Sequence, residues 1–153
     1  MFLFVLFMFF PFFLLHKCAI HPPTFKIEMK NPYSPVYMTC IEEAKKDLRA
    51  NARPELTSYP DSLDEYSTVI LAYPNYWRTM PMAVYTFLEH YDFTGKTILP
   101  LCTNECSGMG SSERNIKKLV PGATVKKGLP ITGSNAANAD GAVKRWLADN
   151  GLV

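Results

Sequence analysis

Residues 67–77 read STVILAYPNYW, and this stretch decides the fold. Residues 67–73 form a compact, uncharged run that is partly β-branched, and a proline ends it. Runs of this kind are typical of strands in a parallel sheet, where both faces of the strand are buried. The stretch therefore predicts an interior strand at 67–73, with two aromatic residues, Tyr76 and Trp77, in the loop that follows.

Strand-like and helix-like segments alternate around this run from residue 24 to the end of the chain. Residues 24–29 alternate apolar and polar side chains and predict an edge strand, whereas residues 34–51 carry an apolar stripe and predict a helix lying on the sheet. The pattern indicates an α/β domain with a parallel sheet, in the order βαβαβαβα. The other expected elements are a helix with Thr79 as its N-cap, a strand at 96–102, a helix from Ser111 or Ser112, a strand at 125–129, and a last helix that starts at Asn138 or Asp140, buries Val143, Trp146 and Leu147 and is closed by Gly151.

Length and composition exclude several classes of protein. The chain has 153 residues, enough for one ordinary domain, and 48% of them are hydrophobic and 20% charged. A net charge of +2 lacks the basic excess expected of a protein that binds nucleic acid. Four cysteines are too few for a disulfide framework.

The first fifteen residues differ sharply from the rest, because they read MFLFVLFMFFPFFLL. Five interpretations compete: the core of a signal peptide, a short membrane anchor, a buried strand, a hydrophobic arm for a partner, and a wrongly assigned start. A signal peptide has positive charge before its apolar core, whereas here Lys17 follows it. A membrane span needs about 20 apolar residues, and this run is shorter and contains Pro11.

Two predicted loops leave neighbouring strands at the same edge of the sheet, where ligands of doubly wound folds bind. The loop at 73–79 holds bulky aromatic side chains, which offer a stacking face. The loop at 103–112 is polar and contains glycines, and it runs into a helix N-terminus whose backbone N–H groups can bind a flat heterocycle. An aromatic loop beside a loop rich in donors is what a flavin ring requires.

Each of these features, taken singly, also fits a structural role. Trp77 or Tyr76 alone is more often a packing or surface aromatic residue. Residues 108–112 resemble a dinucleotide-binding loop that lacks its third glycine. Cys102 and Cys106 have a C-x3-C spacing and no histidine nearby, so zinc or dithiol chemistry is the weaker interpretation. We predict no catalytic side chain and no metal site.

Several short motifs together resemble the flavodoxin family, and most closely its short bacterial members. The resemblance covers roughly residues 25–152 and implies a doubly wound sheet of order 2-1-3-4-5 that holds FMN without a covalent bond. The motifs are NARPEL at 51–56, YPNYW at 73–77, TMPM at 79–82, GKT at 95–97, CTNE at 102–105 and SGMGSSER at 107–114. The resemblance implies that Pro74, Asn75, Tyr76 and Trp77 flank the isoalloxazine ring, and that Thr103, Asn104, Glu105, Ser107, Gly108 and Gly110 hydrogen-bond its edge.

The chain departs from the family pattern at both ends of the expected site. Flavodoxins begin with a buried strand, a phosphate-binding loop rich in Ser, Thr and Gly, and a helix, and none of these is evident here. Arg78 and Cys106 stand where the family pattern has glycine, and a side chain at either position adds strain if the backbone needs a positive φ. Arg78 could instead partly replace the missing phosphate anchor.

The missing first strand would lie in the middle of the sheet. Residues 2–10 are apolar enough to fill that place. Residues 11–23, however, contain three prolines and no polar face, so they are a poor covering helix for a parallel crossover. We therefore expect residues 1–24 to be a segment foreign to the family (an anchor, signal-like, or a wrongly assigned start), and residues 25–153 to be a truncated flavodoxin-like domain whose first strand is missing or replaced.

Two functions follow from these expectations. The first is an FMN-binding electron-transfer protein or small flavin oxidoreductase, whose partner is a redox protein or a small-molecule electron donor or acceptor. The second is a non-enzymatic, flavodoxin-derived module without flavin. A redox protein that uses Cys102 and Cys106 is a weaker third hypothesis. The expected location is the cytoplasm, with membrane association through residues 1–15 as an alternative.

Overall fold

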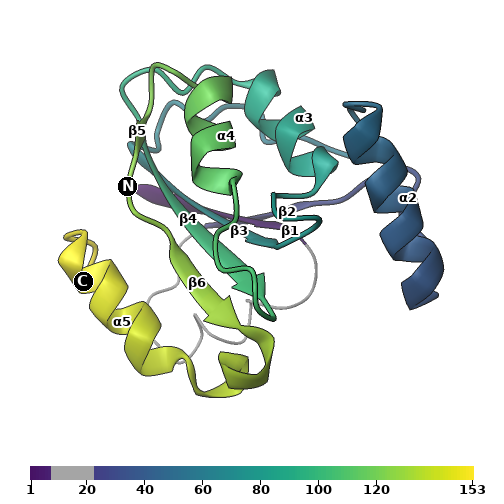
Figure 1. Cartoon of the computed structure of the whole chain (residues 1–153). Helices are drawn as coiled ribbons and strands as arrows, with labels where there is room; N and C mark the ends of the chain where they lie inside the picture. The colour runs from purple at the N-terminus through teal and green to yellow at the C-terminus, as the bar shows by residue number, and fades with distance from the viewer. Residues whose placement is uncertain (8–22) are drawn as a thin grey trace.

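All six strands of the sheet run parallel in this computed structural model, which describes residues 1–7 and 23–153. The strand order is β2-β1-β3-β4-β5, and β6 also pairs with β4 (Figure 1). This is the order 2-1-3-4-5 that the family resemblance implies. The strands are β1 (Phe2–Phe7), β2 (Thr24–Ile27), β3 (Thr68–Pro74), β4 (Thr97–Asn104), β5 (Thr124–Val125) and β6 (Leu129–Thr132), and the helices are α2 (Tyr37–Arg49), α3 (Met82–His90), α4 (Ser112–Leu119), η1 (Gly133–Asn138) and α5 (Asp140–Asp149).

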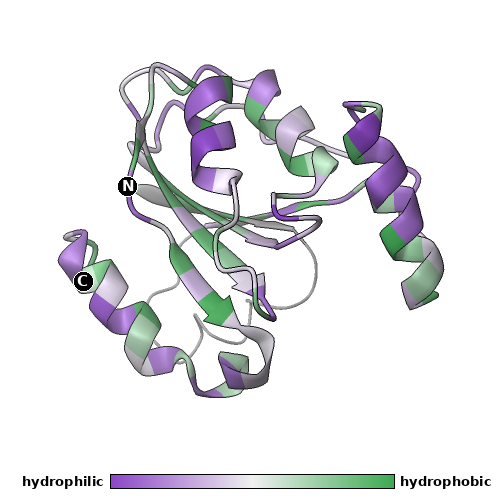
Figure 2. Ribbon diagram, in the orientation of Figure 1, coloured by the Kyte–Doolittle hydropathy of each residue, from purple (hydrophilic) through white to green (hydrophobic). Residues whose placement is uncertain are grey.

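Helices cover both faces of the sheet, with α3 and α4 on one face and α5 on the other (Figure 1). Figure 2 shows hydrophobic residues along the strands and mostly hydrophilic ones over α2 and α4. The buried side chains accordingly form two clusters. The larger includes Phe87 and Ile116 under α3 and α4, and the smaller includes Val143 and Trp146 of α5, as the sequence predicts.

The apolar N-terminal run supplies the central strand of the sheet. Val5 pairs with Phe25 of β2 on one side and with Leu71 of β3 on the other. Leu3 and Val5 are buried in the larger cluster. Of the two alternatives for the first strand, missing or replaced, the structure has the second.

The crossover between β1 and β2 lies outside the described residues, and so does the rest of the apolar run, residues 8–15. Among residues 1–7 and 23–153, no helix is both long and apolar enough to span a membrane. The division of the chain between residues 24 and 25 stays a prediction, and Thr24 itself begins β2.

Two local expectations are wrong, because a distant contact decides the local structure, and a third is right only in part. Pro81, not Thr79, occupies the N-cap of α3, since the Thr79 hydroxyl is buried against that of Tyr85. The last strand is split into β5 and β6, which pair with the start and the end of β4. Helix α2 stands beside α3 at the β2 edge (Figure 1); Ala44 of its predicted stripe is buried and Leu48 packs against the larger cluster, whereas Tyr37 is 75% exposed.

The burial of β1 predicts a large stability cost for a small change at Val5. Val5 is 0% exposed, so Val5→Ala leaves a cavity in the sheet core, and we expect it to lower the free energy of unfolding by about 2 kcal/mol. Val36→Ala is the matched control, because Val36 is 60% exposed and its truncation should cost less than about 0.5 kcal/mol. Urea unfolding of both variants measures the difference. Equal stabilities would contradict a central position for β1.

Candidate functional site

The two loops singled out by the sequence leave the sheet side by side. Strands β3 and β4 stay paired to their carboxyl ends, where Pro74 lies opposite Thr103. The backbone N–H of Asn75 then donates to the carbonyl of Thr103 at 2.7 Å, which continues the pairing into the loops. The loop after β3 and the loop after β4 therefore begin in contact.

Asn75 joins the two loops through its side chain. Its Nδ2 donates to the Gly108 carbonyl at 3.0 Å, and its Oδ1 accepts from the backbone N–H of Arg78 at 2.9 Å. Asn104 supports the second loop in the same way, since its Oδ1 accepts from the backbone N–H of Gly108 at 3.0 Å. Its Nδ2 reaches the carbonyl of Ile131 in β6 at 3.3 Å. Two asparagines thus shape both loops.

Residues 76–79 form a tight two-residue turn. The backbone N–H of Tyr76 donates to the Thr79 carbonyl at 2.8 Å, and that of Thr79 donates to the Tyr76 carbonyl at 3.1 Å. The two central residues, Trp77 and Arg78, have φ of 51° and 64°. A type I′ turn needs positive φ at both positions and favours Asn-Gly there. The chain instead places two bulky side chains on a strained turn and so projects them from the sheet edge.

The expectation of strain is confirmed at one of the two positions that replace a family glycine. Arg78 lies in the left-handed region, where a side chain costs free energy. Cys106 is not among the residues with positive φ; in its loop Gly108 and Gly110 take that conformation, at 54° and 56°. The glycines therefore stand where the second loop needs them.

Close contact with Arg78 explains why residue 110 is a glycine. A Cβ on Gly110 would lie 2.2 Å from the carbonyl oxygen of Arg78, which no side chain can tolerate. Next in sequence, Ser111 donates its backbone N–H to the same oxygen at 2.7 Å and its hydroxyl at 3.0 Å. The strained turn of the first loop is thus locked onto the end of the second.

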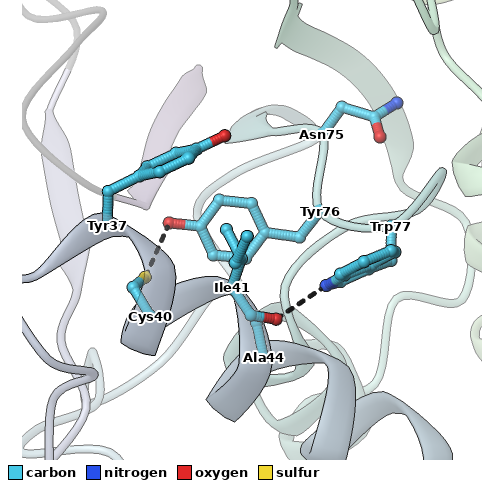
Figure 3. A pocket seen from close by; sticks show the side chains of 7 residues that line it. All are labelled: Tyr37, Cys40, Ile41, Ala44, Asn75, Tyr76 and Trp77. Atoms are coloured by element: carbon cyan, nitrogen blue, oxygen red, sulfur yellow. Dashed lines mark hydrogen bonds between the residues drawn. The ribbon is translucent and has the colours of Figure 1, made fainter.

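An open hollow of about 330 Å³ lies between the first loop and α2 (Figure 3). The indole of Trp77 is held there, because its Nε1 donates to the carbonyl of Ile41 at 2.9 Å and Lys45 Nζ lies 4.5 Å from the ring centroid. The hydroxyl of Tyr76 lies 4.0 Å from the sulfur of Cys40. The lining residues are Tyr37, Cys40, Ile41, Ala44, Asn75, Tyr76 and Trp77.

Only some of the predicted cofactor-binding residues line this hollow, and α2 supplies lining residues that were not predicted. Asn75, Tyr76 and Trp77 face it, whereas none of the predicted residues of the second loop is among its lining side chains. Tyr37 and Cys40 do line it, although α2 was expected to pack on the sheet. That the predicted residues of the first and second loops bind a cofactor stays a prediction.

The second loop turns an exposed stretch of backbone towards solvent. Glu105, Cys106 and Ser107 are all exposed. Within the described part of the chain, their backbone N–H groups have no hydrogen-bond acceptor. Three successive free donors beside an aromatic turn are able to bind an electron-rich edge of a planar ligand.

The two cysteines of the dithiol hypothesis lie in different environments. Cys102 is fully buried, and burial raises the pKa of its thiol to about 12, which keeps it protonated at neutral pH. Asn75 opposes this shift only in part by hydrogen bonding. Cys106, by contrast, is exposed.

Comparison with known proteins gives one matching family and several similar structures. A family model described as flavodoxin matches residues 23–150. A search of curated proteins finds no match. A protein from Bacteroides uniformis that is assigned as a flavoprotein is 24% identical to this chain. Its TM-score is 0.81, over 96% of this chain and 97% of that chain. A similarly titled protein from Bacteroides eggerthii is 22% identical with a TM-score of 0.80, over 96% and 95% of the two chains.

A third solved structure is a flavoprotein from Lactobacillus acidophilus in complex with FMN. It is 12% identical to this chain, with a TM-score of 0.68 over 90% of this chain and 96% of that chain. Because these identities are all below 25%, the solved structures show only a shared fold, whereas the family model shows membership of a family.

The strained turn predicts that glycine at position 78 stabilises the protein. Arg78→Gly removes the cost of a side chain at positive φ, and we expect a gain of about 1 kcal/mol in the free energy of unfolding. Arg78→Ala removes the same charged group but keeps a Cβ, so it should leave stability within about 0.5 kcal/mol of the starting protein. Thermal or urea unfolding of the pair separates backbone strain from side-chain effects. Equal stability of the two variants would show that the turn carries no strain.

Proposed function

Because the chain belongs to the flavodoxin family, we propose that it binds FMN at the carboxyl edge of β3 and β4 and acts as an electron-transfer protein or small flavin oxidoreductase. The observation that carries this proposal is the pair of interlocked loops. One presents an exposed aromatic turn and the other presents free backbone donors. A flavoprotein of similar fold is in complex with FMN, which supports the choice of cofactor.

The residues of the two loops fit the ring of a flavin. Trp77 is 43% exposed and rigidly held, so an isoalloxazine that stacks on it would bury apolar surface at little entropic cost. The backbone N–H groups of Glu105, Cys106 and Ser107 suit its polar edge. FMN bound there would supply one- and two-electron chemistry.

The same residues would bias that chemistry towards the reduced form of the ring. Negative charge that develops on a reduced ring is stabilised by backbone donors that are already oriented. Tyr76 and Trp77 would shield the faces of a bound ring from water and so strengthen those hydrogen bonds. No side chain of the protein needs to act as a nucleophile or a base.

The residues of the chain fit the phosphate of FMN less well than they fit its ring. Residues 8–15, which follow β1, read MFFPFFLL and contain no hydroxyl group and no glycine. The exposed guanidinium of Arg78 is a cation on the ring side of the site, and it is the alternative anchor. We propose that the ring supplies most of the affinity and the phosphate little.

The proposed partner is a redox protein or a small electron donor or acceptor that approaches the exposed turn. The cytoplasm is the proposed location. The second candidate function, a flavodoxin-derived module without flavin, is favoured by one observation, the poor phosphate site.

Titration with FMN tests the proposal. We expect the folded protein to quench flavin fluorescence with a saturable curve, and Trp77→Ala to weaken binding about tenfold, since a stacked aromatic pair is worth up to about 1.5 kcal/mol. Trp77→Phe, which keeps a stacking face, should weaken binding less. An unquenched titration of protein that circular dichroism shows to be folded would favour the module without flavin.

Riboflavin, which lacks the phosphate, is the second ligand of the same experiment. We expect its dissociation constant to lie within about threefold of that of FMN, because residues 8–15 offer no hydroxyl group and no glycine for a phosphate loop. A preference for FMN of about tenfold or more that Arg78→Ala abolishes would assign the phosphate to Arg78 instead.

A further inference from the structure

A small hydrogen-bond network under the strained turn connects the two loops a second time. Its centre is Asn115, in the first turn of α4. The Nδ2 of Asn115 lies 2.9 Å from Oγ1 of Thr79, 2.8 Å from the hydroxyl of Tyr85 and 3.3 Å from Oγ of Ser111. The hydroxyls of Thr79 and Tyr85 are 2.9 Å apart and bond each other.

The network contacts the closing half of the strained turn at two neighbouring residues, Thr79 and Arg78. Thr79 closes the turn through its two backbone hydrogen bonds to Tyr76, and its side chain is buried. Ser111 donates twice to the carbonyl of Arg78, the second central residue of the turn. Asn115 contacts both Thr79 and Ser111, so one amide group ties the last residue of the turn to the residue that locks its carbonyl.

The donors and acceptors fit this arrangement closely. An asparagine amide carries two N–H hydrogens, and all three contacts of Asn115 are to hydroxyl oxygens that can accept. The oxygens of Thr79 and Tyr85 lie 2.9 Å apart and can share one hydrogen, which leaves the other for Ser111. A leucine at this position would have a similar volume but would supply neither hydrogen, leaving the buried Thr79 hydroxyl only Tyr85 as a partner. The cost would fall on the turn, because Thr79 is its closing residue.

We propose that Asn115 is a positioning residue for the flavin site, which holds the Trp77–Arg78 turn against the second loop and so fixes the aromatic face relative to the backbone donors. This inference rests on the proposed function for its flavin part. Asn115 is nowhere among the residues that the sequence or the family resemblance singles out. It acts through Thr79 and Ser111, without contact to the ring.

Asn115→Leu tests the proposal in the flavin-free protein first. We expect the backbone amides of Thr79 and Ser111 to exchange with solvent about tenfold faster, because losing one or two hydrogen bonds releases the turn locally. Asn150→Leu is the matched control, since Asn150 also donates from a helix end, to the carbonyl of Trp146 at 2.7 Å, but lies on α5. Its exchange effect should stay near the end of α5.

The second measurement is the affinity for FMN and the visible circular dichroism of the bound flavin. We expect Asn115→Leu to weaken FMN binding about tenfold and to change the dichroism, and Asn150→Leu to change neither. Tyr85→Phe, which removes one member of the network but keeps the packed ring, should show a smaller change of the same sign. It also keeps the test decisive if Asn115→Leu does not fold.

The outcomes separate this inference from the proposed function. Faster exchange over the whole chain, in step with lower global stability, would overturn the positioning role. Unchanged FMN affinity and dichroism in both network variants would overturn it as well. A starting protein that binds no FMN, with local exchange as expected, would refute the proposed function and the flavin part of the inference, while the anchoring of the turn would stand.

Discussion

Two donors of Ser111 converge on one carbonyl oxygen, that of Arg78, and the geometry of the site depends on this contact. It requires a left-handed backbone at Arg78, a residue without a Cβ at position 110, and a helix that begins at Ser112. The first of these requirements costs free energy, because the side chain of Arg78 lies in the left-handed region. Rigidity of this kind is useful where a planar ligand must meet a stacking face and a row of donors together.

The parallel sheet places these loops, and much of it can be predicted from the sequence. The buried run at 67–73 and the alternation around it predict a parallel α/β sheet and most helices, because burial on both faces leaves a plain pattern. The strand order 2-1-3-4-5 is implied only by the family resemblance. The role of β1 is harder to predict: residues 2–7 fit the central slot, yet the chain after them looks unsuited to a crossover. The split of the last strand into β5 and β6 also depends on pairing with β4, which no local pattern encodes.

The candidate site, like the sheet, can be predicted from the sequence only in part. Loop residues such as Trp77 and Gly108 can be predicted from the sequence, because aromatic residues and glycines that follow the strands of a parallel sheet indicate a ligand site. The role of Asn115 and the contact of Trp77 with Ile41 are not visible, since each joins residues 36 positions apart. Helix α2 was expected to pack along its stripe, and the hollow beside it follows from where the sheet edge places it. Long-range contacts of this kind need the fold before they can be seen.

The central claim is that a flavin binds across the two interlocked loops. A ¹⁵N–¹H correlation spectrum of the labelled protein, recorded during addition of FMN, tests this most directly. We expect the largest shifts at the indole N–H of Trp77 and at the amides of Glu105, Cys106 and Ser107, with little change on α5. Shifts that gather elsewhere, or a spectrum unchanged by saturating FMN, would contradict it.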